Sequence, residues 1–454
     1  MDAGPLSGDN ADRYGRGPRS FASSAWDQAA PVLFLAIFLF FWVTLDAFKD
    51  NSDPGVLLPS MGGDIANQIV ALLLSAGAVL YVLQSDIRRA LIVVSPALVA
   101  LFICFAVTAL VSDMPAIALR KIVLAGLIVV QGAALLLIPA SRRQFALLLA
   151  IGLSISLALS ILGLALVPAR TIHQASDLVE PNLAGDWRGV FAHKNVLGSA
   201  SALMVVIGLF VRRAYDARVG WAIVATAAAL LLFAGSKTSI GLLPIAFVMA
   251  YAMQAVGSAG ARILLALFAL GGMSLLTVGS AFFPSVRALI EVTGVDVTFT
   301  DRVAIWQLSL SMLAERPLTG FGFQTLWGSA DMLSSGSSIE SWANKATNAH
   351  NGYLDIALNA GIPGLVLFLF WFVVQPVRDL SQSIRVGADP VLNTLFLRIW
   401  AFALFSGCLE SIYFGGGGPV WITVLIAVFG LRLQARARLA HEDDHFHFRP
   451  ARTS

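Results

Sequence analysis

The sequence predicts an all-α polytopic membrane protein with about 12 transmembrane helices, and three observations support this fold class. Hydrophobic residues make up 57% of the 454 residues and charged residues only 13%, with a mean hydropathy of +0.80. Apolar runs of spanning length recur from residue 29 to residue 432, and arginines gather in the short connections between many of them. A soluble chain could not hide so much apolar surface, so a membrane must cover it.

Each apolar run is expected to form one helix across the membrane. A helix needs roughly 20 residues to cross the hydrocarbon core, so the shorter runs must recruit flanking residues. The runs lie at residues 29–47, 65–83, 90–111, 119–139, 145–167, 196–211, 220–234, 238–256, 262–283, 361–376, 391–411 and 418–432.

The arginines indicate which side of the membrane each connection occupies. Pairs such as 88–89, 142–143 and 212–213 fall on the same side as both chain ends, together with most of the 30 basic residues. Short, positively charged loops mark the cytoplasm. Both termini are therefore predicted to be cytoplasmic, while the long loops 168–195 and 284–360 face the periplasm or exterior.

This orientation divides the chain into five segments. They are a polar cytoplasmic tail (1–28), transmembrane helices one to nine (29–283), a large periplasmic loop that carries the catalytic segment (284–360), transmembrane helices ten to twelve (361–432) and a cytoplasmic tail (433–454). No phosphate-binding glycine loop occurs in the cytoplasmic connections, so nothing predicts the use of ATP.

The most informative polar stretch on the outer face surrounds His350. Asn348 or Asn351 is placed to cap a helix that begins near Gly352. His350 would then lie beside a helix N-terminus, where backbone donors favour an anion, and could take a proton from a hydroxyl. The alternative is a loop histidine that only satisfies local backbone groups. A helix break is expected just beyond, at residues 361–364.

Four cations accompany His350 on this face, namely Arg188, Lys194, Lys237 and Arg302. Cations aimed at one pocket suit a diphosphate, and the planar fork of arginine matches phosphate oxygens especially well. Plainer interpretations stay open: Lys237 could extend to the membrane interface, Trp306 could sit there, and Asn195 could cap the next helix. Catalysis on the outer face without ATP requires a substrate that already carries its energy, such as a lipid-linked diphosphate sugar.

Five motifs occur in one order along residues 180–375. They are Arg-Gly-Val-Phe-Ala-His-Lys-Asn at 188–195, Ser-Lys-Thr-Ser at 236–239, residues 302–306, Arg-Pro-Leu-Thr-Gly-Phe-Gly at 316–322 and Asn-Ala-His-Asn-Gly-Tyr-Leu at 348–354. In this order the region resembles the O-antigen ligase and polymerase superfamily of bacterial membrane glycosyltransferases. Its strongest likeness is to the exopolysaccharide polymerase branch, the ExoQ-like proteins.

The resemblance implies a GT-C-like, metal-independent, inverting glycosyltransferase without a cofactor, in the bacterial inner membrane with its active site facing the periplasm. Its partners would be an undecaprenyl-diphosphate-linked glycan donor, a glycan acceptor, the lipid bilayer, a flippase and a chain-length regulator, and no nucleic acid.

The family likeness also implies roles for single residues. His350 would match the histidine that activates the acceptor hydroxyl, and Arg188 and Arg302 the arginines that hold the donor diphosphate. Lys237 falls where related ligases carry arginine. Lys194 adds a cation, and the supporting residues are His193, Asn195, Asn351, Trp306 and Tyr353.

The leading hypothesis is a polymerase that joins repeat units of an exported polysaccharide. A ligase that transfers finished glycan to lipid A or protein shares the chemistry and stays open. A transporter is the alternative of a different class, since twelve spans are ordinary there too. The polar residues, however, gather outside the membrane rather than at its midplane. The roles of Asp355 and Glu410 stay undecided.

Overall fold

The computed structural model describes residues 21–45, 47–52, 65–85, 87–178, 180–292, 294, 296–297, 299, 302–327, 329, 346–415 and 418–437. Most of the predicted tails 1–28 and 433–454 lies outside these residues, as does the part of the predicted periplasmic loop from 330 to 345.

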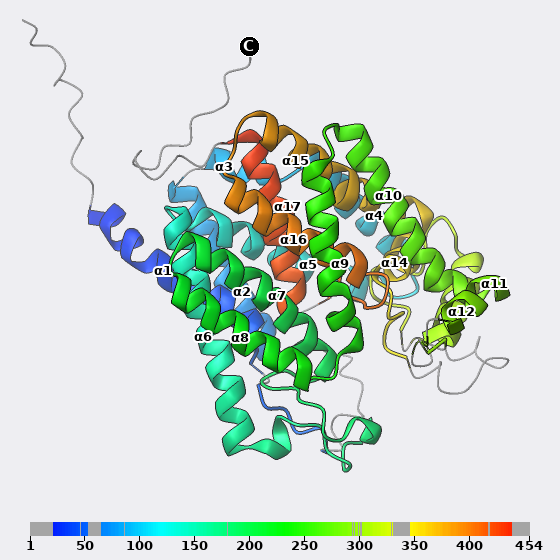
Figure 1. The fold of residues 1–454 in the computed structure, drawn as a ribbon. Helices are drawn as coiled ribbons and strands as arrows, with labels where there is room; N and C mark the ends of the chain where they lie inside the picture. The colour runs from blue at the N-terminus through cyan, green and yellow to red at the C-terminus, as the bar shows by residue number, and fades with distance from the viewer. Residues whose placement is uncertain are drawn as a thin grey trace, which may run out of the picture.

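The described residues form an all-α helical bundle (Figure 1). The α-helices are α1 (Phe21–Trp42), α2 (Ile65–Ser85), α3 (Ile87–Val93), α4 (Pro96–Leu110), α5 (Pro115–Leu137), α6 (Arg142–Leu166), α7 (Lys194–Ala214), α8 (Ala217–Phe233), α9 (Lys237–Ala255), α10 (Ala259–Leu276), α11 (Pro284–Val292), α12 (Arg302–Glu315), α14 (Gly352–Leu369), α15 (Gln375–Arg385), α16 (Pro390–Ser406) and α17 (Pro419–Arg436). Short 3₁₀ turns η2 (Pro168–Arg170), η3 (Pro181–Leu183) and η4 (Val278–Ala281) and a π-helical turn η7 (Phe370–Val374) join them.

The chain is a polytopic membrane protein, but its helices do not all reach spanning length. Within the described residues, 8 helices are long and apolar enough to cross a bilayer, or 9 if the bent pair α3–α4 counts as one span. Three further predicted runs form shorter apolar helices, Ala29–Trp42, Ala217–Phe233 and Pro390–Ser406. That the chain crosses the membrane twelve times therefore stays a prediction. Exposed side chains such as Val248, Phe268 and Leu73 lie on outward faces, as a lipid environment requires.

The predicted third span, 90–111, is not one straight helix. Helices α3 and α4 meet at an angle of 68°. Ser95 caps α4 by accepting a hydrogen bond from the backbone N–H of Leu98 at 3.1 Å, and Pro96 occupies the first turn of α4. Proline is suited to the start of a helix but cannot continue the preceding one, which explains the break.

The predicted break at residues 361–364 is confirmed within α14. Gly361 has φ +67°, which interrupts the helical geometry. A Cβ at this position would lie 2.4 Å from the backbone of Leu318, so only glycine fits. The freed backbone groups are satisfied by the segment before it: the N–H of Ile362 donates to Pro317 and the N–H of Phe321 donates to Leu358. The 316–321 segment is thereby fixed against the broken helix.

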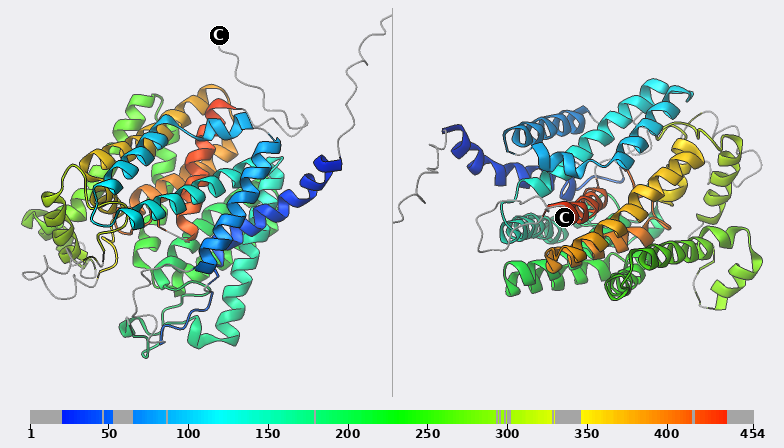
Figure 2. Two further views of the ribbon diagram at one scale, coloured as in Figure 1. Left: turned by 180° about the vertical axis from the view of Figure 1, so that it is seen from behind. Right: turned by 90° about the horizontal axis from the view of Figure 1, so that it is seen from above.

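The core is centred on α17, drawn in red in the middle of the bundle when seen from above (Figure 2). Of its 18-residue span, 94% is buried. The loop that precedes α17 places Phe414 against Trp421 and Phe105, with ring centroids 4.6 and 5.3 Å apart. The 167–193 connection and residues 43–52 lie together at one end of the bundle (Figure 1).

Candidate active site

His350 lies in the turn directly before α14. The cap predicted at Asn348 or Asn351 is confirmed at Asn351, whose Oδ1 accepts the backbone N–H groups of Tyr353 and Leu354, both at 3.0 Å. The Oδ1 of Asn348 instead accepts the backbone N–H of His350 at 2.9 Å. His350 has φ +46°, a left-handed conformation that is uncommon for residues with a side chain. The turn therefore holds the imidazole in a defined direction.

A second loop, residues 407–413 after α16, packs against this turn. The backbone N–H of Gly352 donates to the carbonyl of Gly407 at 2.8 Å, and Nδ2 of Asn351 donates to the carbonyl of Cys408 at 3.0 Å. A Cβ on residue 352 would lie 2.4 Å from the ring of Tyr413, so only glycine allows the approach. This contact brings Glu410 beside the histidine.

Glu410 connects the predicted base to one of the predicted arginines. Its Oε1 accepts a hydrogen bond from Nη2 of Arg302 at 2.8 Å, while its Oε2 lies 3.7 Å from Nδ1 of His350. The second distance is too long for a hydrogen bond. The side chains of Arg302 and Glu410 are only 10% and 14% exposed, whereas His350 is 35% exposed. Since Nδ1 faces Glu410, Nε2 is the nitrogen left for a substrate.

Opposing effects set the pKa of Glu410. Burial raises this pKa because the carboxylate loses water, and the nearby charges of Arg302 and His350 lower it. The charges prevail, so the pKa lies below the ordinary value for glutamate. Glu410 is therefore a carboxylate at neutral pH.

Three side chains hold the turn from behind. Nε1 of Trp306 donates to the carbonyl of Ala349 at 3.1 Å. Oδ1 of Asp355 accepts both the backbone N–H of Ala349 at 3.0 Å and Nε1 of Trp327 at 3.1 Å. Trp306 is fully buried, so its interpretation as a membrane-interface residue is wrong. Asp355 has a structural role in fixing this turn.

Tyr353 fixes the start of α14 against the end of α16. Its hydroxyl donates to the carbonyl of Leu404 at 2.9 Å and accepts a hydrogen bond from the hydroxyl of Tyr413 at 3.0 Å. The side chain is buried. Tyr353 therefore supports the site through the backbone.

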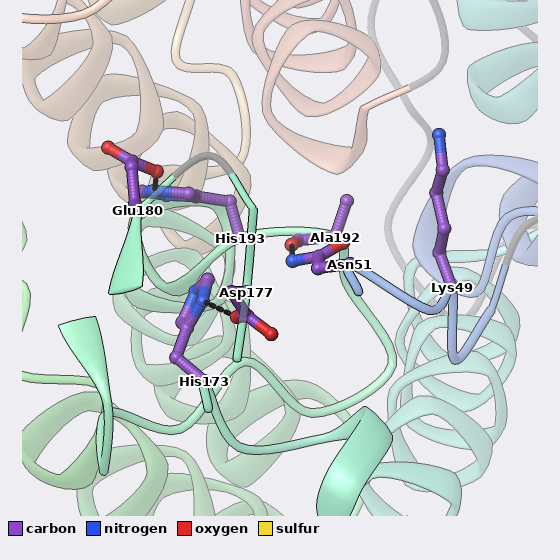
Figure 3. Close-up of a pocket in the computed structure, with 7 residues that line it drawn as sticks. All are labelled: Lys49, Asn51, His173, Asp177, Glu180, Ala192 and His193. Carbon is purple, nitrogen blue, oxygen red and sulfur yellow. Dashed lines mark hydrogen bonds and ion pairs between the residues drawn. The ribbon is translucent and has the colours of Figure 1, made fainter. Parts of the chain in front are cut away.

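The connection before α7 holds a second polar cluster (Figure 3). His193 is the N-cap of α7: its Nδ1 accepts the backbone N–H of Asn195 at 3.1 Å, and its Nε2 lies 2.7 Å from Oε2 of Glu180. Because Nδ1 accepts, Nε2 carries the proton and donates to Glu180. The prediction that Asn195 caps this helix is wrong, because His193 takes that place.

His173 and Asp177 form a second histidine–carboxylate pair in the same connection. Nδ1 of His173 lies 2.9 Å from Oδ2 of Asp177, and its Nε2 accepts the backbone N–H of Lys194 at 3.2 Å. Burial lowers the pKa of His173, and the hydrogen bond to Asp177 offsets this only in part. The imidazole is thus neutral near pH 7 with both nitrogens engaged, which makes it an anchor for the loop.

Arg188 is completely buried beside this pair. Its Nη1 makes a long contact of 3.5 Å to the carbonyl of Ala192, while its Nε and Nη2 have no hydrogen-bond partner within the described residues. Burial lowers the pKa of Arg188, and the charges of Asp177 and Asp50 oppose this. Buried donors without partners are costly, so this guanidinium requires further acceptor oxygens.

One of the two predicted lysines, Lys194, pairs with Asp186. Nζ of Lys194 contacts Oδ2 of Asp186 at 2.5 Å. The turn before Lys237 also comes close to Asp186: a Cβ added to Gly235 would lie 2.7 Å from Oδ1 of Asp186. Lys237 itself is exposed at the start of α9. The structure therefore brings the 186–194 segment against the turn between α8 and α9.

A cavity of about 230 Å³ opens within this cluster (Figure 3). It is lined by Lys49, Asn51, His173, Asp177, Glu180, Ala192 and His193. The pKa of Glu180 is lowered chiefly by the hydrogen bond from His193, and the charge of His350 also contributes. In the part of the chain that is described, no three His, Cys, Asp or Glu side chains are grouped to hold a metal ion.

Several residues of these clusters had no assigned role in the sequence, among them Glu410, Asp355, His173, Asp177 and Glu180. Glu410 was noticeable only as an ionisable group in an apolar run, and no spacing linked it to His350. The spacing of four between His173 and Asp177 signals contact on a helix, but here both lie in an irregular loop.

Removing the cap of α14 is expected to disturb both stability and the site. Asn351→Ala should lower the free energy of unfolding by about 1–2 kcal/mol, because two helix N–H groups and the carbonyl of Cys408 lose a partner. Activity should also fall, since the turn that holds His350 loosens. Ser258→Ala, which removes the N-cap of α10, is the matched control. Thermal unfolding and transfer rate, measured together, should separate the two variants: equal activity would show that the cap does not position His350.

Two stretches of the chain each match a protein family. Residues 221–369 match the O-antigen ligase family, and residues 10–145 match a family of unknown function. The first stretch includes α12, the turn with His350 and all of α14, and it ends before Glu410. The predicted resemblance is confirmed for this stretch, while its narrower placement in the exopolysaccharide polymerase branch stays a prediction.

Two curated relatives carry related names. Proteins of Rickettsia conorii and Rickettsia felis, both provisionally named polysaccharide ligases, are 25% and 24% identical to this chain over 170 residues. Each match covers 35% of this chain and 40% of the relative. The likeness therefore concerns one part of each protein.

Proposed function

We propose that this protein is a membrane glycosyltransferase that polymerises undecaprenyl-diphosphate-linked oligosaccharide repeat units into an exported polysaccharide. The observation that carries the proposal is the contact of Glu410 with both His350 and Arg302 at the start of α14. It brings together a base, a group that orients the base and a cation from three separate segments of the chain, and two of these residues, His350 and Arg302, lie in the stretch that matches the O-antigen ligase family.

The reaction is a displacement at the anomeric carbon of the lipid-linked glycan. Nε2 of His350 takes the proton of an acceptor sugar hydroxyl, and the hydroxyl oxygen forms a bond to the anomeric carbon. The bond from that carbon to the diphosphate oxygen breaks, and its electron pair leaves with undecaprenyl diphosphate. Attack opposite the leaving group inverts the anomeric centre. Glu410 stabilises the imidazolium that forms on His350.

The arginines act on the leaving diphosphate. Arg302 donates to Glu410 through Nη2, and an arginine fork offers further donors to phosphate oxygens. Arg188 has two buried nitrogens without partners within the described residues, and phosphate oxygens are acceptors of the right charge. Lys194 and Lys237 add positive charge at the rim. Neutralising the charge of the departing diphosphate lowers the barrier to its release.

The cavity beside His193 suits a sugar ring. Its lining offers carboxylates, an amide, an ammonium group and a carbonyl, which are donors and acceptors for several hydroxyl groups. In this proposal the cavity holds the glycan that presents or receives the reacting oxygen.

The proposal includes the predicted topology. Twelve crossings follow if the bent pair α3–α4 and the three shorter apolar helices also span the membrane. Both termini then lie in the cytoplasm, and His350 faces the periplasm of a bacterial inner membrane. A flippase would deliver the lipid-linked units, and a chain-length regulator would act with the polymerase.

A ligase is the second candidate, favoured by the description of the matched family and the names of the relatives. Both candidates use the same donor and the same base, and they differ in the acceptor. The test is a membrane assay in which labelled lipid-linked repeat units are supplied alone or together with a lipid A core acceptor. Elongation of the units alone supports a polymerase, transfer only to the added acceptor supports a ligase, and neither product from folded protein contradicts both.

A further inference from the structure

A shallow groove lies on α7 and α16, away from the candidate active site. It is lined by Val206, Leu209, Phe210 and Arg213 from α7 and by Val391, Thr394, Leu395 and Arg398 from α16. Helices α8 and α9 diverge from the turn that joins them (Figure 1). Each of them contributes an aromatic ring to a neighbouring arginine. The guanidinium of Arg212 lies 5.0 Å from the ring of Trp221, and that of Arg398 lies 4.6 Å from the ring of Phe247.

The arginines of this groove are not neutralised by carboxylates. No ion pair with Asp or Glu involves Arg212, Arg213 or Arg398 in the described ranges, and Nε of Arg212 is buried without a hydrogen-bond partner. Arg212 and Arg213 are close enough to repel Arg398 electrostatically. Arg213 and Arg398 therefore present two like charges at one groove, where an anion would relieve their repulsion.

Two acidic residues beside the ends of α7 and α16 are already engaged. Oδ1 of Asp216 caps α8 by accepting the N–H groups of Arg218 and Val219, at 2.8 and 2.9 Å. Oδ2 of Asp389 binds Nη1 of Arg142 at 2.8 Å. These two carboxylates are therefore not the counter-charge of Arg213 and Arg398.

We propose that this groove binds an anionic phospholipid. Its phosphate would lie between Arg213 and Arg398, and an acyl chain would follow the apolar lining of α7 and α16. A soluble anion would satisfy the arginines but not the apolar lining, and a neutral lipid would do the reverse; an anionic amphiphile satisfies both. Basic pockets between membrane helices are suited to such head groups.

The groove is distinct from the proposed transferase site. Arg213 is in the last turn of α7, whereas Lys194 of the polar cluster is the first residue of the same helix. A helix of this length separates its ends by the thickness of a bilayer core. The lipid proposal therefore stands independently of the proposed reaction.

The test is native mass spectrometry of the full-length protein, delipidated in neutral detergent and titrated with phosphatidylglycerol or phosphatidylcholine. One phosphatidylglycerol per chain should be retained with a preference of about tenfold or more over phosphatidylcholine, because two arginines contact its phosphate. The double variant Arg213→Gln/Arg398→Gln should lose that preference. The control Arg378→Gln should keep it, because this arginine lies over Phe370 outside the groove.

Three outcomes would overturn the proposal. They are equal retention of both lipids by the wild type, full preference in the folded double variant, and a protein dimer that holds no lipid and is lost in the variant. If the double variant does not fold, as judged by thermal unfolding, the single variant Arg213→Gln replaces it. Arg213 is exposed, so this change should leave the fold intact and still reduce the preference.

Discussion

Replacement of His350 by alanine is expected to lower the rate of glycan transfer by about 10²–10⁴-fold, the usual contribution of a general base. Without the imidazole, the acceptor hydroxyl must attack while still holding its proton. The arginines that contact the diphosphate are unchanged, so the loss should appear in kcat much more than in the KM for the donor. Initial rates of elongation with labelled lipid-linked units would measure both quantities.

The control for this variant is Thr347→Ala, an exposed change in the same loop. Both variants should reach the abundance of the wild type in the membrane, since His350 is itself partly exposed. A His350→Ala protein that keeps transfer within a few-fold of the wild type would make this histidine a loop residue without a chemical role.

Replacement of Glu410 by glutamine is expected to weaken both activity and stability. The amide cannot hold an imidazolium in place, and a misplaced base costs about 10²-fold in rate. It also leaves the buried Arg302 without its counter-charge, and breaking a buried ion pair in this way costs about 3 kcal/mol. Glu410→Asp should recover part of the rate, because a shorter carboxylate still carries the charge. Glu291→Gln, an exposed glutamate on α11, is the control for both readouts.

The same pair predicts how stability depends on pH. Because the pKa of Glu410 is lowered in the folded protein, its pair with Arg302 stabilises the fold above the ordinary glutamate pKa. That contribution is lost as the pH falls through the lowered folded-state value. Thermal unfolding over this acidic range should show a step in the wild type that is absent from Glu410→Gln. Parallel curves would mean that the pair contributes nothing to stability.

Much of the bundle could be predicted because membrane helices can be recognised from their long apolar runs. The expected runs at 65–83, 119–139 and 145–167 coincide with α2, α5 and α6, and the glycine and proline at 361 and 363 correctly indicated a broken helix. Local breaks were harder to place. Ser95 and Pro96 lie inside one continuous apolar run. Because the run is apolar on both sides of them, its hydropathy does not indicate the bend between α3 and α4.

The site could be predicted only where it is local in sequence. The cap at Asn351 follows from the chemistry of its own turn, and so does the placement of His350. The contact with Glu410 depends on how the loop after α16 packs against Gly352, which no local pattern encodes. The burial of Arg188 has the same origin, because the 167–193 connection folds back on itself through Thr171.

The measurement that tests the proposed site most directly is a double-mutant cycle in transfer rate between His350 and Glu410. If Glu410 acts through the imidazole, His350→Ala/Glu410→Gln should be about as slow as His350→Ala alone, because a positioning residue has nothing left to position. If the two losses multiply instead, Glu410 acts independently of His350, and the assignment of His350, Glu410 and Arg302 to one catalytic unit is contradicted.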